Sequence, residues 1–419
     1  MVDDTLIRSL NRLMRIGEQI RRGYEKHPYP SAEKSILRRA RWQLAPMEWI
    51  NAMWQWRRLS PDRILVAGCG TGAEAFALRR RFSCAEIVAV DFSPRSIAIA
   101  RDMQKRIPKM SNIRFLAGDF TSPQFPKSVG CNFMFISCHG VLSYVPQPGR
   151  ALRNFVRCLT PDGALYLGVN GSAHFSGAWR MALPAFGFKM TDFRDDRRLR
   201  DILRLCGVMA GRDVRPVAKL PASYLASDLF GSLIHNLPLA EWTQLTRQAG
   251  LHFLGSFSAM RQLRPALNNG SYRLLIPRSR AEVSELLDVL APSSFHRLVF
   301  SRTAVVNPPW ETPEALLDWR PLLTPVYLDR WPKGKGLSES LRHLKIKSTA
   351  TNTLIELCVP EWELEILRQS EGKQTIRKIL APCVRAIKPQ VLQQQLYLLY
   401  QLAVINLLRS PSNSRSLAA

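Results

Sequence analysis

Residues 64–72 read Ile-Leu-Val-Ala-Gly-Cys-Gly-Thr-Gly, and this stretch decides the class of fold. Four apolar residues run into three glycines at alternate positions, the pattern of a buried parallel strand that ends in a tight turn and opens a helix. Glycine suits such a turn because a Cβ atom would keep a ligand away from the backbone and because the turn can need a positive φ. The start of the following helix has unpaired N–H groups that can hold a polar or anionic ligand group. The stretch therefore predicts a site for a nucleoside-type cofactor.

Strand and helix patterns alternate after this turn. The helix that begins at Pro94 has a clear start, because Ser93 is a good N-cap and proline is favoured at the first helical position. Such alternation predicts right-handed βαβ units and a parallel sheet covered on both faces. Strands are predicted at 63–67, 86–90, 113–117, 133–137 and 164–169, and helices at 73–82, 94–107 and 148–159.

The alternation breaks at residues 174–235, which contain several prolines and an Arg-rich helix around Asp195–Leu205. We interpret this stretch as an insertion beside the sheet. A helix at 239–249 and strands at 251–257 and 272–276 then resume the pattern. Because a loop and not a helix joins the last two strands, we expect them to be antiparallel and to complete a seven-stranded sheet.

The sequence divides into four parts. The first contains an amphipathic helix at 4–22, which we expect to pack on the main domain in preference to a membrane surface, and a Trp-rich helical segment from Trp42 to Trp56. The predicted parts are an N-terminal helical lid segment at 1–60, an α/β domain at 61–279, a mostly helical, winged-helix-like regulatory domain at 280–409 and a disordered tail at 410–419.

Secondary structure in the C-terminal region is predicted from a compact apolar pattern. A strand at 353–359 precedes helices at 362–368 and 375–380, and a long, two-sided apolar helix follows at 390–408. Short helices before a longer apolar helix favour the winged-helix interpretation.

The 419-residue chain is strongly basic, with a formal net charge of +26. This balance suggests acidic partners such as nucleic acid, an anionic membrane or an acidic protein. The arginines are nevertheless spread along the whole chain, and no recognised nucleic-acid-binding module accompanies them. Binding to nucleic acid is therefore not favoured.

The eight cysteines form no C-x-x-C pair, so we expect neither a metal site nor a dithiol redox motif. Their pattern fits a reducing cytoplasm. No apolar run reaches the roughly eighteen residues that a membrane span needs. The first residues include Asp3 and Asp4 and lack an apolar core, unlike a secretory signal. We therefore expect a cytoplasmic protein without a transmembrane segment.

Polar residues at two further strand ends specify the cofactor more closely. Asp91 ends the second strand about twenty residues after the glycines, where a carboxylate can accept both ribose hydroxyl protons. The third strand ends in Gly118-Asp119-Phe120, which suits an adenine through a hydrogen bond to its exocyclic amine and through stacking. Gly72 extends the turn to G-x-G-x-G, which leaves room for a methionine tail and not for a pyrophosphate. Gly68, Gly70 and Ala73 also satisfy the dinucleotide pattern G-x-G-x-x-A, so a nicotinamide-dependent oxidoreductase stays open as an alternative.

Residues 63–170 resemble the class I S-adenosylmethionine-dependent methyltransferases. The glycine turn, Asp91, Gly118-Asp119 and the turn Thr160-Pro161-Asp162-Gly163 occur in the order and spacing of that family. The resemblance implies a Rossmann-like seven-stranded sheet, S-adenosylmethionine as cofactor and methyl transfer to an N or O acceptor, a protein or a small molecule. It implies cofactor contacts from Gly68, Cys69, Gly70, Thr71, Gly72, Glu74, Asp91, Phe92, Gly118, Asp119 and Phe120.

Two flanking regions carry further resemblances. Tyr24-Glu25 and Pro28-Tyr29-Pro30 are similar to the N-terminal segment of a bacterial subset of these enzymes. This similarity implies that Tyr24 and Tyr29, with His27, form a lid that contacts the cofactor. The C-terminal region resembles, more faintly, the winged-helix ends of some bacterial protein-lysine methyltransferases, which implies a weak preference for a protein or peptide acceptor.

One residue departs from the family pattern. Family members usually carry Asp or Glu two residues before the first glycine, where this chain has Val66. That carboxylate ordinarily orients the turn and the amino group of the methionine. Glu74 at the helix start can take its place, and a solvated acid favoured by the helix dipole is the alternative interpretation of Glu74.

His139 follows the fourth strand in Ser137-Cys138-His139-Gly140, the position that faces the acceptor in this fold. It is the candidate catalytic base, and a structural histidine is the alternative. No catalytic triad is expected, because methyl transfer from a sulfonium depends mainly on alignment. Residues 307–310, Asn-Pro-Pro-Trp, resemble the acceptor motif of adenine and glutamine methyltransferases but lie beyond the predicted sheet, so we interpret them as a Pro-Pro turn.

Two other functions remain possible at this level. A domain that binds S-adenosylmethionine without turnover, as a sensor or scaffold, would fit Val66 and the long C-terminal region. Methylation of RNA is a variant of the methyltransferase hypothesis that the net charge of +26 motivates.

Overall fold

The computed structural model describes residues 4–30, 61–190, 193–209, 220–256, 263, 270–323, 343–348 and 353–409. The chain divides into two compact units. The first comprises Met1–Leu44, Pro61–Gly250 and Pro292–His296, and the second Ala45–Ser60, Leu251–Ala291 and Arg297–Ala419.

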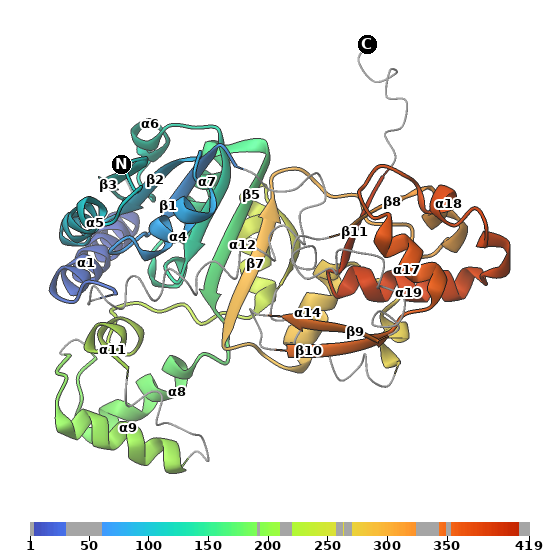
Figure 1. Cartoon of the computed structure of the whole chain (residues 1–419). Helices are drawn as coiled ribbons and strands as arrows, with labels where there is room; N and C mark the ends of the chain where they lie inside the picture. The colour runs from blue at the N-terminus through green and yellow to red at the C-terminus, as the bar shows by residue number, and fades with distance from the viewer. Residues whose placement is uncertain are drawn as a thin grey trace. The chain divides into compact units, whose positions relative to one another are not determined.

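A seven-stranded sheet organises the fold (Figure 1). Its order is β3-β2-β1-β4-β5-β7-β6. The neighbours from β3 to β5 are parallel, whereas β6 and β7 are antiparallel. The strands are β1 (Arg63–Ala67), β2 (Glu86–Asp91), β3 (Ile113–Ala117), β4 (Phe133–His139), β5 (Leu159–Asn170), β6 (His252–Ser256) and β7 (Phe295–Ser301).

On one side of β1 the sheet continues with β2 and β3, and on the other side it continues with β4 and β5. The strand order reverses between β1 and β4, and in open α/β sheets ligands bind beyond the carboxyl ends of the strands at such a point. Ile64, Leu65 and Val66 of β1 have no exposed surface, as expected for a central parallel strand covered on both faces. The connecting helices are α4 (Ala73–Arg81), α5 (Pro94–Arg106), α6 (Phe125–Val129), η1 (Leu142–Tyr144), α7 (Pro148–Cys158) and α12 (Leu239–Gln248).

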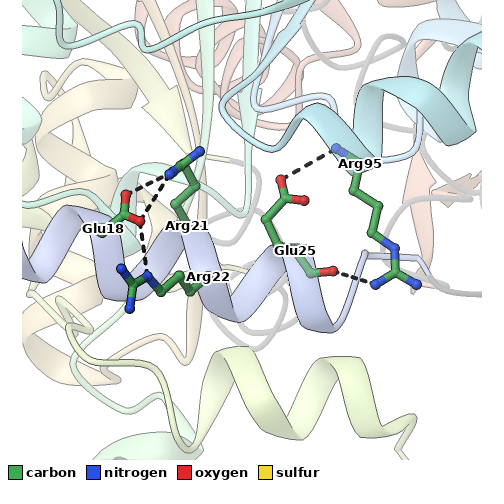
Figure 2. A network of polar contacts seen from close by, with 5 residues as sticks. All are labelled: Glu18, Arg21, Arg22, Glu25 and Arg95. Atoms are coloured by element: carbon green, nitrogen blue, oxygen red, sulfur yellow. Dashed lines mark hydrogen bonds and ion pairs between the residues drawn. The ribbon is translucent and has the colours of Figure 1, made fainter.

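The N-terminal helix α1 (Asp4–Lys26) is held against the start of α5. The Arg95 guanidinium donates a hydrogen bond of 2.8 Å to the backbone carbonyl of Glu25, and the Arg95 N–H lies 3.4 Å from the Glu25 carboxylate (Figure 2). On the exposed side of α1, Glu18 accepts hydrogen bonds from Arg21 and Arg22. The contacts of Glu25 with Arg95 place the end of α1 beside the carboxyl end of β2.

The stretch after β5 builds a small helical layer with its own core. Its elements are α8 (Phe175–Ala182), η2 (Leu183–Phe186), α9 (Arg197–Met209) and α11 (Ala222–Asp228). Trp179, Leu199 and Leu225 meet in that core. Helix α11 also packs against α1, which brings this layer to the same side of the sheet as the N-terminal helix (Figure 1).

The second unit contains two small antiparallel pairs of strands, β9 with β10 and β8 with β11. Arg280 stabilises this unit from a buried position, since its guanidinium donates to the Tyr400 carbonyl and to the Asn406 side chain and lies 3.8 Å from the centre of the Tyr400 ring. Its elements beyond β6 and β7 are η3 (Ser271–Leu275), α14 (Arg280–Leu290), η4 (Pro313–Asp318), β8 (Arg320–Leu323), β9 (His343–Ser348), β10 (Thr353–Cys358), α17 (Glu361–Arg368), α18 (Ile376–Ile379), η5 (Val384–Ala386), α19 (Pro389–Gln401) and β11 (Ile405–Leu408).

The predicted α/β class and the seven-stranded sheet are confirmed, and one strand was placed wrongly. The stretch predicted as a strand at 272–276 is the 3₁₀ helix η3, in which Tyr272 is buried and Leu274 is 84% exposed. A short apolar run does not distinguish strand from helix. The final strand is β7, and α14 precedes it, so the domain boundary predicted at residue 279 falls inside the sheet.

The predicted helix at 390–408 also needs correction. Helix α19 ends at Gln401, and Ile405–Leu408 forms β11, which pairs with β8. The predicted Trp-rich helix at 42–56 and the tail at 410–419 lie outside the described residues. The winged-helix interpretation stays a prediction. Among the described residues, no helix combines the length and the apolar character that crossing a membrane requires.

Candidate functional site

The glycine turn stands at the carboxyl end of β1, where the strand order reverses. Gly68, Gly70 and Gly72 have φ values of +76°, +52° and +94°, a backbone region that residues with a side chain rarely adopt. A Cβ atom on Gly68 would lie 2.4 Å from the side chain of Val141. The turn therefore needs glycine both for its backbone conformation and for its close packing.

Asp91 at the end of β2 fixes the shape of this turn. One carboxylate oxygen accepts a 2.8 Å hydrogen bond from the Gly70 N–H, and the other accepts a 2.9 Å bond from the Ser93 N–H. Burial raises the pKa of Asp91 to about 6, although these hydrogen bonds oppose the shift. The carboxylate thus lies against the turn, and each oxygen keeps a lone pair for a ligand hydroxyl.

The segment after α1 docks directly on the turn. The Thr71 N–H donates to the Tyr29 carbonyl at 3.1 Å, and the Thr71 hydroxyl donates to the Pro30 carbonyl at 2.9 Å. Tyr24 lies edge-on to the ring of Phe92, with 5.7 Å between the ring centres. Of the two residues that the sequence predicts as a lid, Tyr29 thus lies at the glycine turn and Tyr24 lies against Phe92, the residue after Asp91.

Glu74 reaches from the first turn of α4 toward β4. Its carboxylate accepts a hydrogen bond from the Ser137 hydroxyl, and Ser137 is the register partner of Val66 in the β1–β4 ladder. Burial raises the pKa of Glu74 to about 7, opposed by this hydrogen bond. A carboxylate is therefore present one strand away from Val66, which supports the view that Glu74 replaces the acid missing there.

Asp119 and Phe120, which follow β3, differ in their exposure to solvent. Asp119 is exposed and accepts hydrogen bonds from the backbone N–H and the hydroxyl of Thr121, at 2.7 Å each. Phe120 is 6% exposed, and its ring packs against Phe155 and Phe125 at 5.5 and 6.4 Å. Phe120 therefore belongs to the hydrophobic core, which corrects its expected stacking on an adenine.

His139 ends β4 on the same face as Ser137, two residues earlier. Its Nδ1 atom lies 2.8 Å from the Tyr166 hydroxyl, and the two rings stack with 5.7 Å between their centres. Gly168 leaves room for this ring, because a Cβ atom there would lie 2.4 Å from His139 Nδ1. A position toward the acceptor is compatible with this geometry, and the role of His139 as a base stays a prediction.

The motif at 307–310 belongs to the second unit. Trp310 is 2% exposed and packs against Tyr397 and Tyr400, with 5.0 and 5.3 Å between the ring centres. Its backbone N–H closes a tight turn onto the Pro308 carbonyl. These contacts fit the interpretation as a Pro-Pro turn.

Sequence reasoning missed a polar network at the ends of β4 and β5. The Tyr144 hydroxyl donates a 2.6 Å hydrogen bond to Asp228 and accepts one of 3.3 Å from Asn170. Asn170 also donates to Asn236 at 3.1 Å. The position of Asn170 at a strand end was visible in the sequence, whereas Asp228 stands in the insertion without any motif around it.

Comparison with known proteins identifies the class of this domain. Residues 65–167 match the family described as a methyltransferase domain. Over 125 residues the chain is 29% identical to malonyl-[acyl-carrier protein] O-methyltransferase of Halorhodospira halophila, a match that covers 29% of this chain and 40% of that protein. Over 108 residues it is 34% identical to demethylmenaquinone methyltransferase of Deinococcus radiodurans, covering 26% and 43%. The chain spans about two fifths of the length of the curated relatives it matches.

A solved structure is similar over more of the chain. PKMT2 from Rickettsia typhi, in complex with AdoHcy, superposes with a TM-score of 0.54 at 14% identity, covering 87% of this chain and 75% of that one. At this identity the likeness concerns the fold alone. It extends well beyond the residues that match the family.

The fold and the family match define a class I S-adenosylmethionine-dependent methyltransferase domain, and S-adenosylmethionine is the cofactor of this class. The residues around the turn fit this cofactor, since two carboxylates, Glu74 and Asp91, can accept from an ammonium group and from ribose hydroxyls. They fit a pyrophosphate poorly, because the carboxylates would repel it and the N–H groups of Gly70 and Thr71 already donate within the protein.

The docking of Tyr29 on the turn leads to a prediction for Gly70→Ala. The added Cβ would lie 2.3 Å from the Tyr29 carbonyl, a backbone atom that cannot rotate away. We expect the substitution to release the segment after α1 and to speed tryptic cleavage after the exposed Lys26 about tenfold, the effect of ~1.4 kcal/mol.

Gly140→Ala is the matched control for this prediction. Gly140 also has a positive φ, +69°, but an added Cβ there meets nothing within 4 Å. This variant should lose about 1 kcal/mol of stability from backbone strain and keep the cleavage rate of the unaltered protein. Equal cleavage rates in the two variants would contradict the docking.

Proposed function

We propose that this protein is a methyltransferase that transfers the methyl group of S-adenosylmethionine to an N or O acceptor, with a weak preference for a protein or peptide. The observation that carries the proposal is the glycine turn flanked by the carboxylates of Glu74 and Asp91, within a domain of the methyltransferase class. The preference for a protein acceptor rests on the resemblance of the C-terminal region stated above.

The hydrogen bonds and the exposure of the residues around the turn support the following assignment of the cofactor contacts. Glu74 receives the amino group of the methionine, and Asp91 receives the ribose hydroxyls. The exposed carboxylate of Asp119 accepts from the exocyclic amine of the adenine, beside the rings of Phe92 and Tyr24. Gly68, Cys69, Gly70, Thr71, Gly72 and Gly118 form the backbone surface of the site, and Tyr29 closes it.

The cofactor supplies a methyl group that is already activated on a sulfonium sulfur. The protein therefore has mainly to align the acceptor with that methyl group and to exclude water. His139 lies two residues beyond Ser137 on the same face of β4, so it is the residue we assign to the acceptor side, where it can receive a proton.

The oxidoreductase alternative finds less support. A dinucleotide would bring a pyrophosphate to a turn that has carboxylates on both sides. The antiparallel pair of β6 and β7 is also a feature of the methyltransferase fold that the dinucleotide fold lacks. Binding without turnover remains the second candidate, and the observation that favours it is Val66 in place of the usual acid.

Calorimetric titration with S-adenosylmethionine and, separately, with NADH tests the proposed cofactor. We expect binding of S-adenosylmethionine and none of NADH. Asp91→Ala should weaken that binding about a hundredfold, because it removes an acceptor for the ribose and releases the Gly70 N–H. Asp102→Ala, which removes an exposed acid of α5, is the control and should bind normally. Tight binding of NADH would reject the proposal.

Transfer itself is tested with labelled methyl. Purified protein and labelled S-adenosylmethionine are mixed with fractionated peptides and small amines, and formation of S-adenosylhomocysteine is followed in parallel. Label in an acceptor supports the enzyme, whereas stoichiometric binding without S-adenosylhomocysteine across the panel supports the sensor or scaffold. RNA is included because of the net charge, and salt-sensitive labelling of RNA would favour that variant.

The raised pKa of Glu74 predicts how cofactor affinity depends on pH. A carboxyl with a pKa of about 7 is charged above that pH and neutral below it. Affinity for S-adenosylmethionine should therefore fall as pH is lowered from about 7.5 to about 6.5, since the neutral form attracts the ammonium group less. Glu74→Gln keeps the shape and should bind about tenfold more weakly at the higher pH, with a shallower profile over this range, because only Asp91, with a pKa of about 6, still titrates near it. The same slope in the variant would exclude Glu74 as the group that titrates.

A further inference from the structure

The fold brings together two cysteines that lie far apart in the sequence. Cys131 is exposed and stands two residues before β4, whereas Cys158 is 0% exposed and is the last residue of α7, directly before β5. Phe133 of β4 and Leu159 of β5 are register partners. Paired strands lie about 5 Å apart, so residues next to a register pair are close in space. The two cysteines are therefore neighbours at the amino ends of β4 and β5.

The helices before these strands support the same arrangement. Helix α6 ends at Val129, two residues before Cys131, and it packs against α7, which ends at Cys158. The rings of Phe125 in α6 and Phe155 in α7 meet with 6.4 Å between their centres. Each cysteine thus stands at a junction between a helix and a strand. Both the helix packing and the strand pairing bring these two junctions together.

Arg63, the first residue of β1, acts on both cysteines. Its guanidinium donates a hydrogen bond to the Cys131 carbonyl and lies 4.7 Å from the centre of the Phe133 ring. Its positive charge also lowers the pKa of the Cys158 thiol, against the larger effect of burial. A cation beside an exposed cysteine favours the thiolate, which is the form of cysteine that reacts with oxidants.

The two thiols differ in their access to solvent. Burial raises the pKa of the Cys158 thiol to about 12, and the charge of Cys131 is the second cause of this shift. Cys158 is therefore a neutral, enclosed thiol at pH 7. Because Cys131 is exposed, an oxidant in solution meets Cys131 first.

We propose that Cys131 and Cys158 form a reversible disulfide when hydrogen peroxide oxidises Cys131. The Cys131 thiolate attacks one peroxide oxygen, the O–O bond breaks, and the sulfur becomes a sulfenic acid, while the leaving hydroxide takes up the thiol proton as water. The Cys158 sulfur then attacks the Cys131 sulfur, the S–O bond breaks, and the second hydroxide leaves as water with the proton of the Cys158 thiol. The two thiols lose two electrons, and these reduce the peroxide to water.

This modification site lies at the edge of the sheet opposite the glycine turn. The turn follows the carboxyl end of β1, whereas the cysteines stand at the amino ends of β4 and β5, which run parallel to β1. The disulfide closes a loop from 131 to 158 that contains Ser137 and His139. The inference goes beyond the proposed function and depends neither on the cofactor nor on the acceptor.

Peptide mapping of the full chain tests this inference directly. Protein is reduced with dithiothreitol, freed of it and exposed to hydrogen peroxide, after which the remaining thiols are blocked with N-ethylmaleimide and the protein is digested with trypsin. We expect the tryptic peptides 128–150 and 158–180 to be joined, with fragment spectra that place the bond at Cys131 and not at Cys138. The joined pair should be lost on renewed reduction.

Other products overturn the inference. It fails if Cys158 stays a free thiol while Cys131 becomes a sulfinic acid or bonds to a second copy of the chain. It also fails if neither cysteine reacts, or if the bond to Cys158 comes from Cys138.

Variants separate the roles of the two cysteines. Cys131→Ser removes the exposed sulfur and should abolish the joined peptides. Cys158→Ala leaves the sulfenic acid of Cys131 without a thiol, so dimedone added with the peroxide should label Cys131 in this variant and not in the unaltered protein. Equal labelling of the two proteins would show that Cys158 does not react with the sulfenic acid.

Cys84→Ser is the matched control. Cys84 is an exposed cysteine of the same unit and stands before β2. This variant should keep the joined peptides and their loss on reduction. Loss of the joined peptides in Cys84→Ser would place the reactive pair elsewhere.

Discussion

The hydrogen bond from the Gly70 N–H to the Asp91 carboxylate joins the ends of β1 and β2, and the rest of the site depends on it. It holds the glycine turn in its positive-φ conformation, and that conformation exposes the Thr71 N–H to the Tyr29 carbonyl. The segment after α1 can therefore dock only when the turn is formed. Tyr24, in the last turn of α1, contacts the ring of Phe92, and α1 itself packs against α11 of the insertion.

The electrostatics beside the glycine turn contrast with those of the chain. A protein of net charge +26 has two buried carboxylates, Glu74 and Asp91, beside the glycine turn, and each accepts hydrogen bonds from hydroxyl or backbone N–H donors. Burial raises the pKa of Glu74 and of Asp91, which means that the site disfavours their charged forms until a ligand compensates them. Groups with positive charge or with hydroxyl donors give that compensation. A methionine ammonium and a ribose have this chemistry.

The glycine turn and the carboxylate beside it could be predicted from the sequence because their signals are local. The glycines, the N-cap Ser93 and the acid Asp91 stand within thirty residues of one another, and each strand end was visible as an apolar run. Phe120 was misjudged because an aromatic residue at a strand end can turn into the core as easily as toward a ligand. Strand β7 was not predicted, because only its pairing with β6 shows that this ambiguous apolar run is a strand. The contacts of Asp228 were not predicted, because they depend on the tertiary packing of α11 against α1.

The central claim is that the glycine turn and the segment after α1 together form the cofactor site. Hydrogen–deuterium exchange with and without S-adenosylhomocysteine tests it most directly, because backbone amides report binding at every segment at once. We expect slower exchange in residues 68–74 and also in residues 24–30, with little change in residues 270–290. Protection confined to the second unit, or absent from both of these segments, would show that they do not form the cofactor site.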